Sequence, residues 1–465
     1  IRTFTIDTKA PVVALNSPSN NSWTNNPSVN FQFTATDGLL QACTLYGNFN
    51  GTSFKANQSN TSMVSGTQTT ITLSLPNGTF LWNALCNDTV GNAAFNATNF
   101  TINVDTEKPA IDLNAPVNNF NTSTANVNFN WTATDNLDNN LLCNITINST
   151  INISNIASVN GTHTNRTINN FNDGFYLWNI SCTDNATNVN FSLTRNFTID
   201  TTFPNVSLDY PSNNSWLKNA NTTFNFTLIE INPKRCLLMA NFSGNFIENQ
   251  SISPSSGKNN FSQITIADGN YIWGVTCNDT ANNQNSSANF TVSIDTTLPA
   301  VRLDFPINNS NFSSNPVQFN FTVNESNLNS CSLYINSSGW HKNTTKTDVT
   351  SGNIFNIANL TLADGNYFWN IACNDTAGNE AFNATNLTFS VDTTNPIVAL
   401  LSPANSSTIA TSDVVARASF SDQNIVNCQA RIDSGAVQEM SGDGIISGTA
   451  SFTFTSQSNA QHTIN

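Results

Sequence analysis

Acidic residues are the first candidates for chemistry in this chain, because they are few and recur at fixed intervals. The sequence has 29 Asp and Glu among 465 residues. One group closes each repeat, a second follows a hydrophobic strand pattern, and a third comes two residues after a cysteine. The groups are Asp7, Asp105, Asp200, Asp295 and Asp392; Asp37, Asp135, Glu230, Glu325 and Asp422; and Asp88, Asp184, Asp279 and Asp375. Carboxylates combined with amide and main-chain oxygens are typical calcium ligands.

The nine cysteines form a second recurrent set. No CxxC pair or neighbouring histidine offers the ligands of a zinc site, so we expect disulfides and an oxidising, extracellular location. Cys428 is left without a partner. The expected pairs, each separated by about 40 residues, are Cys43 with Cys86, Cys143 with Cys182, Cys236 with Cys277, and Cys331 with Cys373.

No set of residues has a spacing typical of catalysis. The three histidines, His163, His341 and His462, occupy different positions of the repeat, so none is expected beside a nucleophile. An acid pair repeated in every unit is also unlike an active site. The sequence therefore predicts a non-enzymatic protein with no cofactor other than calcium.

Asparagine is very frequent, with 84 residues, and 40 of them begin an Asn-x-Ser/Thr sequon. In a secreted chain such sites accept N-linked glycans. Some, such as Asn87, lie beside a cysteine, so we do not expect every sequon to be used. The candidate glycosylation sites are Asn50, Asn77, Asn96, Asn144, Asn196, Asn241, Asn289, Asn336 and Asn386.

Composition excludes several classes of protein. Fifteen Lys and Arg give a net charge of -14, which leaves no basic surface for nucleic acid. No apolar run approaches the roughly 20 residues needed to span a bilayer. Since 32 Phe and eight Trp can fill hydrophobic cores, the low charge does not indicate disorder. We expect a folded extracellular chain whose partner is another copy of itself, in head-to-tail or lateral assembly.

The acids and cysteines belong to a repeat of about 95 residues. The segment FTIDT at residues 4–8 returns with small changes at four later places, and a proline follows its Asp four residues on. These landmarks predict the domain boundaries. Residues 1–8 would be the final strand of a preceding immunoglobulin-like domain, residues 9–106, 107–201, 202–296 and 297–393 four such domains, and residues 394–465 a fifth that is incomplete at its C-terminal end.

Within each repeat, apolar and polar residues alternate, which is the period of a β-strand. Val127, Phe129 and Trp131 share one face of such a pattern. Another strand places Trp369 and Cys373 on one face, and the other complete repeats match it. About seven short strands per repeat predict an all-β fold, a tandem array of about five Ig-like or fibronectin-like β-sandwiches.

The sandwich also predicts where the acids and cysteines lie. The first cysteine falls near the start of strand C and the second on its neighbour, strand F, so each disulfide should lie within one sheet. The B–C and F–G loops share the end at which the preceding linker arrives, so Asp105, Asp135 and Asp184 should converge there. Two interpretations remain open: the acids bind calcium and stiffen the junctions, or each caps a turn through its own hydrogen bonds.

Both ends of the sequence are interpreted as lying inside a domain. Cys428 matches the first cysteine of the fifth repeat, whose partner is expected beyond Asn465. We therefore expect a window on a longer chain of repeats. The alternative is that the leading strand of one molecule completes the open sandwich of the next.

One run resembles a known family. Residues 365–375 read G-x-Y-x-W-x3-C-x-D, Asp375 begins the sequence DTAGN, and a later strand ends in VDTTNP. This pattern resembles the bacterial and archaeal immunoglobulin-like (Big-type) tandem repeats of cell-surface proteins, and the many sequons favour an archaeal member.

The resemblance implies a location at the cell surface but no single function. We predict a structural role, as a rigid, disulfide-linked and N-glycosylated segment or subunit of an extracellular filament, sheath or stalk. The alternative is an adhesin or receptor ectodomain in which the repeats are a spacer for a binding tip.

Overall fold

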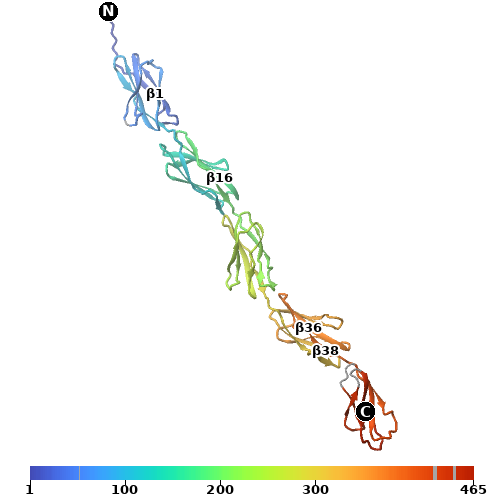
Figure 1. Ribbon diagram of the computed structural model, residues 1–465. Helices are drawn as coiled ribbons and strands as arrows, with labels where there is room; N and C mark the ends of the chain where they lie inside the picture. The colour runs from blue at the N-terminus through green and yellow to red at the C-terminus, as the bar shows by residue number, and fades with distance from the viewer. Residues whose placement is uncertain (52, 423–426, 443–446) are drawn as a thin grey trace.

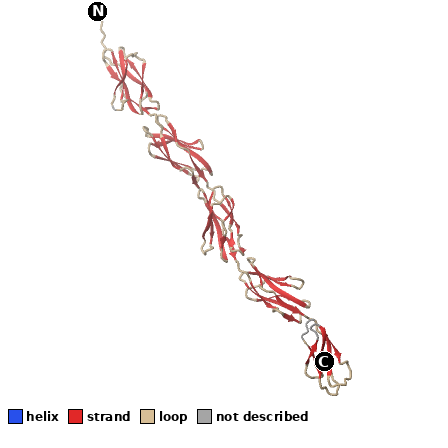
Figure 2. Cartoon of the chain, viewed as in Figure 1, coloured by secondary structure: helices blue, strands red, loops and turns tan. Residues whose placement is uncertain are grey.

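The computed structural model describes residues 1–51, 53–422, 427–442 and 447–465. Figure 1 shows five β-domains arranged end to end in an elongated chain. Figure 2 shows that their secondary structure consists of strands joined by loops. The described residues include no helix that is long and apolar enough to cross a membrane. The predicted all-β, tandem-domain fold is confirmed.

The first domain packs a three-stranded sheet against a six-stranded one. The strand orders are β1–β3–β6 and β2–β9–β7–β4–β5, with β8 paired to β7. All pairs are antiparallel except β2 with β9. The strands are β1 (Val12–Ser17), β2 (Ser22–Thr24), β3 (Ser28–Thr36), β4 (Leu40–Gly47), β5 (Lys55–Asn60), β6 (Gln68–Ser74), β7 (Gly78–Asp88), β8 (Ala93–Phe95) and β9 (Phe100–Val104).

The next three domains repeat this arrangement, and the third adds a two-stranded sheet of β21 and β26. The second contains β10 (Ala110–Ala115), β11 (Phe120–Thr122), β12 (Val127–Thr134), β13 (Asn140–Ile147), β14 (Thr150–Val159), β15 (His163–Ile168), β16 (Gly174–Thr183), β17 (Val189–Phe191) and β18 (Arg195–Ile199). The third contains β19 (Asn205–Tyr210), β20 (Ser215–Leu217), β21 (Asn221–Thr222), β22 (Asn225–Ile229), β23 (Pro233–Ala240), β24 (Ile247–Ile252), β25 (Gly257–Asn260), β26 (Ile264–Thr265), β27 (Gly269–Asp279), β28 (Gln284–Ser286) and β29 (Phe290–Ile294). The fourth contains β30 (Ala300–Phe305), β31 (Ser310–Phe312), β32 (Val317–Asn324), β33 (Leu328–Ile335), β34 (His341–Lys346), β35 (Ile354–Leu360), β36 (Gly365–Asp375), β37 (Glu380–Phe382) and β38 (Leu387–Val391).

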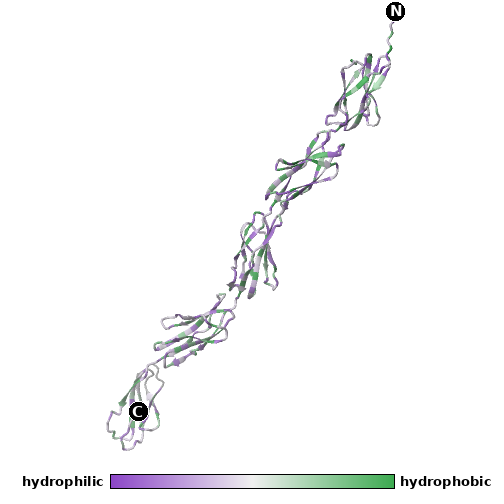
Figure 3. Ribbon diagram, turned by 180° about the vertical axis from the view of Figure 1, so that it is seen from behind, coloured by the Kyte–Doolittle hydropathy of each residue, from purple (hydrophilic) through white to green (hydrophobic). Residues whose placement is uncertain are grey.

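A buried tryptophan marks the core of each of these four domains. In the second domain, Trp178 of β16 packs edge-on against Phe129 of β12, with ring centroids 5.0 Å apart. Trp82, Trp273 and Trp369 occupy the same position in the other three domains. Figure 3 shows hydrophobic residues along the strands and hydrophilic residues in many of the loops. The alternation in the sequence therefore becomes one buried and one exposed face per sheet.

The structure joins the four predicted cysteine pairs as disulfides. In the first domain, Cys43 of β4 lies directly opposite Cys86 of β7, and these strands are neighbours in the six-stranded sheet. The other three pairs lie opposite each other in the same way. Each disulfide therefore lies within one sheet, whereas the bridge of antibody domains joins two sheets.

The two ends of the chain differ from the central domains. Residues 1–8, which the sequence predicts to be a last strand, form no strand. The equivalent β9 has strands on both sides to receive its hydrogen bonds, but no described strand pairs with residues 1–8. In the fifth domain, one described sheet contains β39 (Ile397–Ser402), β40 (Val414–Ser421), β43 (Ser447–Phe454), β42 (Gln438–Gly442) and β41 (Cys428–Ala430).

Candidate metal centres at the domain junctions

The structure gathers the recurrent acids into groups of three. In each group, one carboxylate oxygen from every residue lies within 4.8 Å of those of the other two. Every group combines an acid from the linker with two acids from the domain that follows. The groups are Asp7, Asp37 and Asp88; Asp105, Asp135 and Asp184; Asp200, Glu230 and Asp279; and Asp295, Glu325 and Asp375.

Two of the predicted acids, Asp392 and Asp422, belong to no such group among the described residues. Asp422 directly precedes residues 423–426, which lie outside the described part of the chain.

Strand ends bring each group together. In the second group, Asp105 directly follows β9 of the first domain, Asp135 follows β12 and Asp184 follows β16. β9 stops at the end of the first sandwich that faces the second domain, and β12 and β16 stop at the end of the second sandwich that faces the first. The three loops therefore meet where one domain joins the next. The main-chain N–H of Asp105 also donates to the carbonyl oxygen of Thr24, at 2.9 Å, which fixes the linker to the first domain.

An asparagine fastens the linker to the third acid of each group. The Asn188 Nδ2 donates to the main-chain oxygen of Asp105 at 2.8 Å and to Oδ2 of Asp184 at 2.7 Å. Asn283 and Asn379 make the same pair of bonds in the next two groups. Sequence reasoning did not identify these residues, although the Asp-x3-Asn spacing in each complete repeat was a signal for them.

Turn-capping hydrogen bonds use one oxygen of the second acid. Asp135 Oδ1 accepts from the main-chain N–H of Leu137 at 3.0 Å, and Glu230 Oε1 accepts from that of Asn232 at 2.9 Å. The linker acid Asp105 likewise accepts from the N–H of Glu107 at 3.1 Å. Turn chemistry is therefore present, but it leaves the second oxygen of these carboxylates for another role.

The second oxygen of three middle acids has no hydrogen-bond partner among the described residues. These buried atoms are Asp135 Oδ2, Glu230 Oε2 and Glu325 Oε2. The Glu230 and Glu325 residues are only 5% and 7% exposed. A buried carboxylate oxygen without a partner is costly, because it has lost its water without compensation. A cation held between the three carboxylates would supply the missing interaction.

The Asn136 amide completes the second group. One end of this amide lies 3.2 Å from Asp105 Oδ1 and 3.3 Å from Asp135 Oδ1. With its nitrogen facing inward, the amide donates a hydrogen bond to both carboxylates. With its oxygen facing inward, it would add a fourth oxygen ligand to a cation.

Burial and neighbouring charges change the proton affinity of two carboxylates in the second group. Burial raises the pKa of Asp105 above its ordinary value, and the charges of Asp135 and Asp184 raise it further. Burial likewise raises the pKa of Asp184, and Asp135 and Asp138 add to this effect. None of the ion pairs formed by the described residues involves the grouped acids. A divalent cation would relieve this uncompensated repulsion.

A cavity of about 580 Å³ lies at the junction of the third and fourth domains. Asp295, Glu325 and Asn327 line it, together with Trp216. Within it, Asn327 Nδ2 donates to Asp295 Oδ2 at 2.8 Å. This junction therefore has both the ligands and the space for a hydrated cation.

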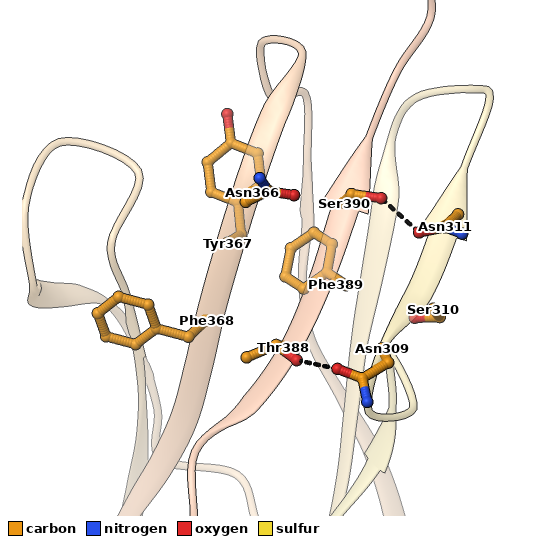
Figure 4. Close-up of a pocket in the computed structure, with 9 residues that line it drawn as sticks. All are labelled: Asn309, Ser310, Asn311, Asn366, Tyr367, Phe368, Thr388, Phe389 and Ser390. Carbon is orange, nitrogen blue, oxygen red and sulfur yellow. Dashed lines mark hydrogen bonds between the residues drawn. The ribbon is translucent and has the colours of Figure 1, made fainter. Parts of the chain in front are cut away.

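A second, smaller cavity has a different chemistry. Figure 4 shows it on the side of the fourth domain, where Thr388 bonds to Asn309 and Ser390 bonds to Asn311. It measures about 320 Å³ and its lining has no ionisable group except the phenol of Tyr367. This cavity offers no charged ligand, so it is not a comparable metal site.

The remaining predicted site residues are spread over the surface and the sheets. Cys428 forms no disulfide and is half-buried. Among the nine candidate glycosylation sites, Asn50, Asn289 and Asn386 are exposed and the other six are half-buried. Residue 52, which completes the sequon of Asn50, lies outside the described residues. No candidate asparagine is therefore buried in a core.

No protein-family model matches the chain, and no curated protein matches it in sequence. Solved structures with similar repeats include a tetra-tandem repeat in the extending region of a large adhesion protein, which is 19% identical, with a TM-score of 0.32 over 83% of this chain and 100% of that one. A bacterial ice-binding adhesin of 1.5 MDa is 12% identical, with a TM-score of 0.26 over 62% of this chain and 100% of that one. Fibronectin(III)-like modules of Clostridium thermocellum CbhA are 13% identical, with a TM-score of 0.27 over 40% and 93%. At these identities the similarity concerns the fold alone.

Proposed function

We propose that this chain is an extended spacer or stalk of an extracellular, cell-surface protein, and that calcium bound at its domain junctions stiffens it. The observation that carries this proposal is the convergence of a linker carboxylate with two carboxylates of the next domain, within 4.8 Å. The unpartnered oxygens of Asp135, Glu230 and Glu325 support it, because they face no other described partner.

The ligands favour calcium over other cations. The groups offer carboxylate and amide oxygens and contain none of the cysteine or histidine ligands that structural zinc sites use. Magnesium demands a strict octahedral arrangement and retains its waters, whereas calcium accepts six to eight oxygens in flexible geometries. We expect a dissociation constant of about 10⁻⁴ to 10⁻³ M, the range of extracellular calcium modules.

Calcium binding would stiffen the chain because each group spans a junction. Asp105 is held to the first domain through Thr24, while Asp135 and Asp184 belong to the second. A cation bound to all three would fix the end of one sandwich relative to the loops of the next. The bond from Asn25 Nδ2 to Thr187 Oγ1, at 3.4 Å, crosses the same junction. Repetition along the chain would convert a flexible array into a rod.

The disulfides support an extracellular location, because such bonds persist where the surroundings are oxidising. Within this function, we propose a non-enzymatic structural role in a filament, sheath or stalk, with N-linked glycans on the exposed sequons and assembly with further copies. A spacer that holds a binding tip away from the cell is the second candidate, and the same stiff rod would serve it.

Calorimetry and small-angle scattering of the unreduced full chain would test the proposal. We expect calcium to bind with heat at millimolar concentration, and the maximum dimension of the chain to increase between chelator and calcium. Magnesium at the same concentration is the matched control for ionic strength. The absence of both heat and a change in scattering would overturn the calcium proposal.

Electron microscopy of material purified from its source separates the two structural roles. Continuous filaments would favour the filament or sheath. Separate rods with a distinct end would favour the spacer.

A further inference from the structure

An exposed aromatic cluster lies on the outer face of the six-stranded sheet in the fourth domain. It contains Tyr334 of β33, Trp340, Phe368 of β36 and Phe382 of β37, and is here called the aromatic platform. Trp340 stacks on Phe368 with ring centroids 5.1 Å apart and planes 16° apart, and Tyr334 meets Phe382 at 5.0 Å. Trp340 is 42% exposed and Phe382 is 45% exposed. Figure 4 shows the Phe368 side chain pointing away from Asn309.

A sequon lies between two members of the platform. Asn336 directly follows β33, two residues after Tyr334, and begins the sequence Asn-Ser-Ser. Its Oδ1 accepts a hydrogen bond from the main-chain N–H of Phe368 at 2.9 Å. The N–H of Gly339 donates to the main-chain oxygen of Asn336, so the chain turns here and brings Trp340 back over Phe368. Asn336 is thus anchored to the residue on which Trp340 stacks.

We propose that Asn336 carries an N-linked glycan whose first sugar packs on the aromatic platform. The donor would be an oligosaccharide linked to a lipid pyrophosphate. Nδ2 forms a bond to the anomeric carbon, the bond between that carbon and the phosphate oxygen breaks, and the lipid pyrophosphate leaves as one Nδ2 proton is lost. The reaction does not alter Oδ1, so the hydrogen bond from Phe368 persists and fixes the direction of the glycan.

The chemistry of the platform fits a sugar ring. The C–H face of a pyranose is weakly positive and apolar, and it complements the negative face of an aromatic ring. Exposed aromatic surface is unfavourable because it contacts water, and a sugar that packs on it would cover it. A covalently attached sugar is held near the platform at high effective concentration. Trp340 and the Asn336 sequon share the loop between β33 and β34, so the chain's own glycan is the occupant best placed to reach the platform. This inference does not depend on calcium binding.

The third domain provides an internal control. Asn241 occupies the same position as Asn336 and begins the sequon Asn-Phe-Ser. Its Oδ1 accepts from the N–H of Ile272 at 2.7 Å, so its side chain is anchored in the same way. The platform positions of Tyr334, Phe368 and Phe382 are taken by Met239, Ile272 and Ser286. A glycan on Asn241 would therefore have the same attachment without the stacked aromatic rings.

The first domain has the aromatic residues without the matching sequon. Tyr46 meets Phe95 at 5.0 Å, and Phe54 lies 6.3 Å from Phe95. The equivalent of Asn336 is Asn48, which bonds to Leu81 but is followed by Phe and Asn and begins no sequon. The fourth domain is therefore the clearest case in which the anchored sequon and the platform coincide.

Glycopeptide mass spectrometry of the full chain, purified from the cells that make it, tests whether Asn336 is occupied. The full chain is then produced by secretion from a host whose N-linked glycans an amidase can cleave. The rate at which this amidase removes the glycan from each asparagine of the folded protein is measured. We expect release from Asn336 to be several-fold slower than release from Asn241. Trp340→Ala should bring the Asn336 rate up to that of Asn241 and leave Asn241 unchanged.

Three results would overturn the proposal. The first is an unoccupied Asn336 in the native chain, and the second is equal release rates that Trp340→Ala does not change. The third is tight binding of a free oligosaccharide by both the glycosylated chain and an Asn336→Gln variant, because the platform would then serve an external sugar. Hydrogen exchange of β33 in each variant verifies that the fourth domain remains folded.

Discussion

Replacing Glu230 by Gln should stabilise the third domain when calcium is absent and reduce the stabilisation that calcium confers. Glu230 Oε1 accepts the N–H of Asn232, and the carbonyl oxygen of Gln can keep this bond. Oε2 has no partner among the described residues, so the amide nitrogen replaces an oxygen that makes no hydrogen bond. The substitution therefore removes one negative charge with almost no change of shape.

Without calcium, the expected gain follows from the repulsion within the group. Oxygens of Asp200, Glu230 and Asp279 lie within 4.8 Å of one another. At that separation two unit charges repel by about 3 kcal/mol at an effective dielectric constant of about 20. Screening by salt reduces this value, so we expect the free energy of unfolding of the third domain to rise by about 1 to 2 kcal/mol.

With calcium, the same substitution removes one of three charged ligands. A ligand at a hundred times its dissociation constant stabilises the folded state by about 2.7 kcal/mol. We expect the loss of one carboxylate to weaken calcium binding at least tenfold, which corresponds to about 1.4 kcal/mol. The calcium-induced stabilisation of the third domain should therefore fall by about half.

Hydrogen exchange measured by mass spectrometry on the unreduced full chain reads each domain separately. A global melt would overlap the transitions of several similar domains, whereas peptides from β27 report the third domain alone. Glu325→Gln is the matched control, because it makes the same change in the fourth domain. If Glu230→Gln lowered the protection of β27 equally in chelator and in calcium, the acid would serve only to cap its turn.

Three further outcomes follow from the same structure. Replacing both Cys236 and Cys277 by Ala opens a loop with a sequence separation of 41, which should destabilise the third domain by about 4 kcal/mol and lower the protection of β27 in hydrogen exchange. Asn283→Ala should cost about 1 to 3 kcal/mol and broaden the angle distribution between the second and third domains in electron micrographs, because it breaks the bond to the linker carbonyl. The hydroxyl of Thr394 and the N–H and hydroxyl of Thr393 donate hydrogen bonds that hold the pKa of Asp364 below its ordinary value. Its stabilising contribution to the fourth domain is therefore complete at neutral pH and is lost as the pH falls below about 4. Asn77 occupies the same position in the first domain and should show no such loss when the hydrogen exchange of β7 is compared with that of β36.

The fold could be predicted from the sequence because the pattern of each strand is strong. The alternation around Phe129 and Trp131 places both residues in the core. The spacing of Cys143 and Cys182 placed them on neighbouring strands, and the structure pairs them directly. Residues 1–8 also have a strand pattern, but they form no strand. An alternating pattern gives a strand only where another strand lies beside it.

The candidate site could be predicted only at the level of loops. The order of the sandwich strands was sufficient to expect Asp105, Asp135 and Asp184 at one junction. The sequence could not show which oxygen of Asp135 caps its turn and which is left without a partner, because that depends on side-chain rotamers. The bridging role of Asn188 was also missed, since it joins a main-chain carbonyl 83 residues away in the chain.

The junctions hold most of what could make this chain respond to its surroundings. The cores are closed by hydrophobic residues and disulfides, so millimolar changes in calcium should leave them unaltered. At a junction, in contrast, Asp295, Glu325 and Asp375 are all nearly buried and lie close together. Such a group brings three negative charges close together, which a bound cation would neutralise. If the dissociation constant lies near 10⁻³ M, ordinary extracellular calcium concentrations would change its occupancy, and the stiffness of the rod would follow the calcium around it.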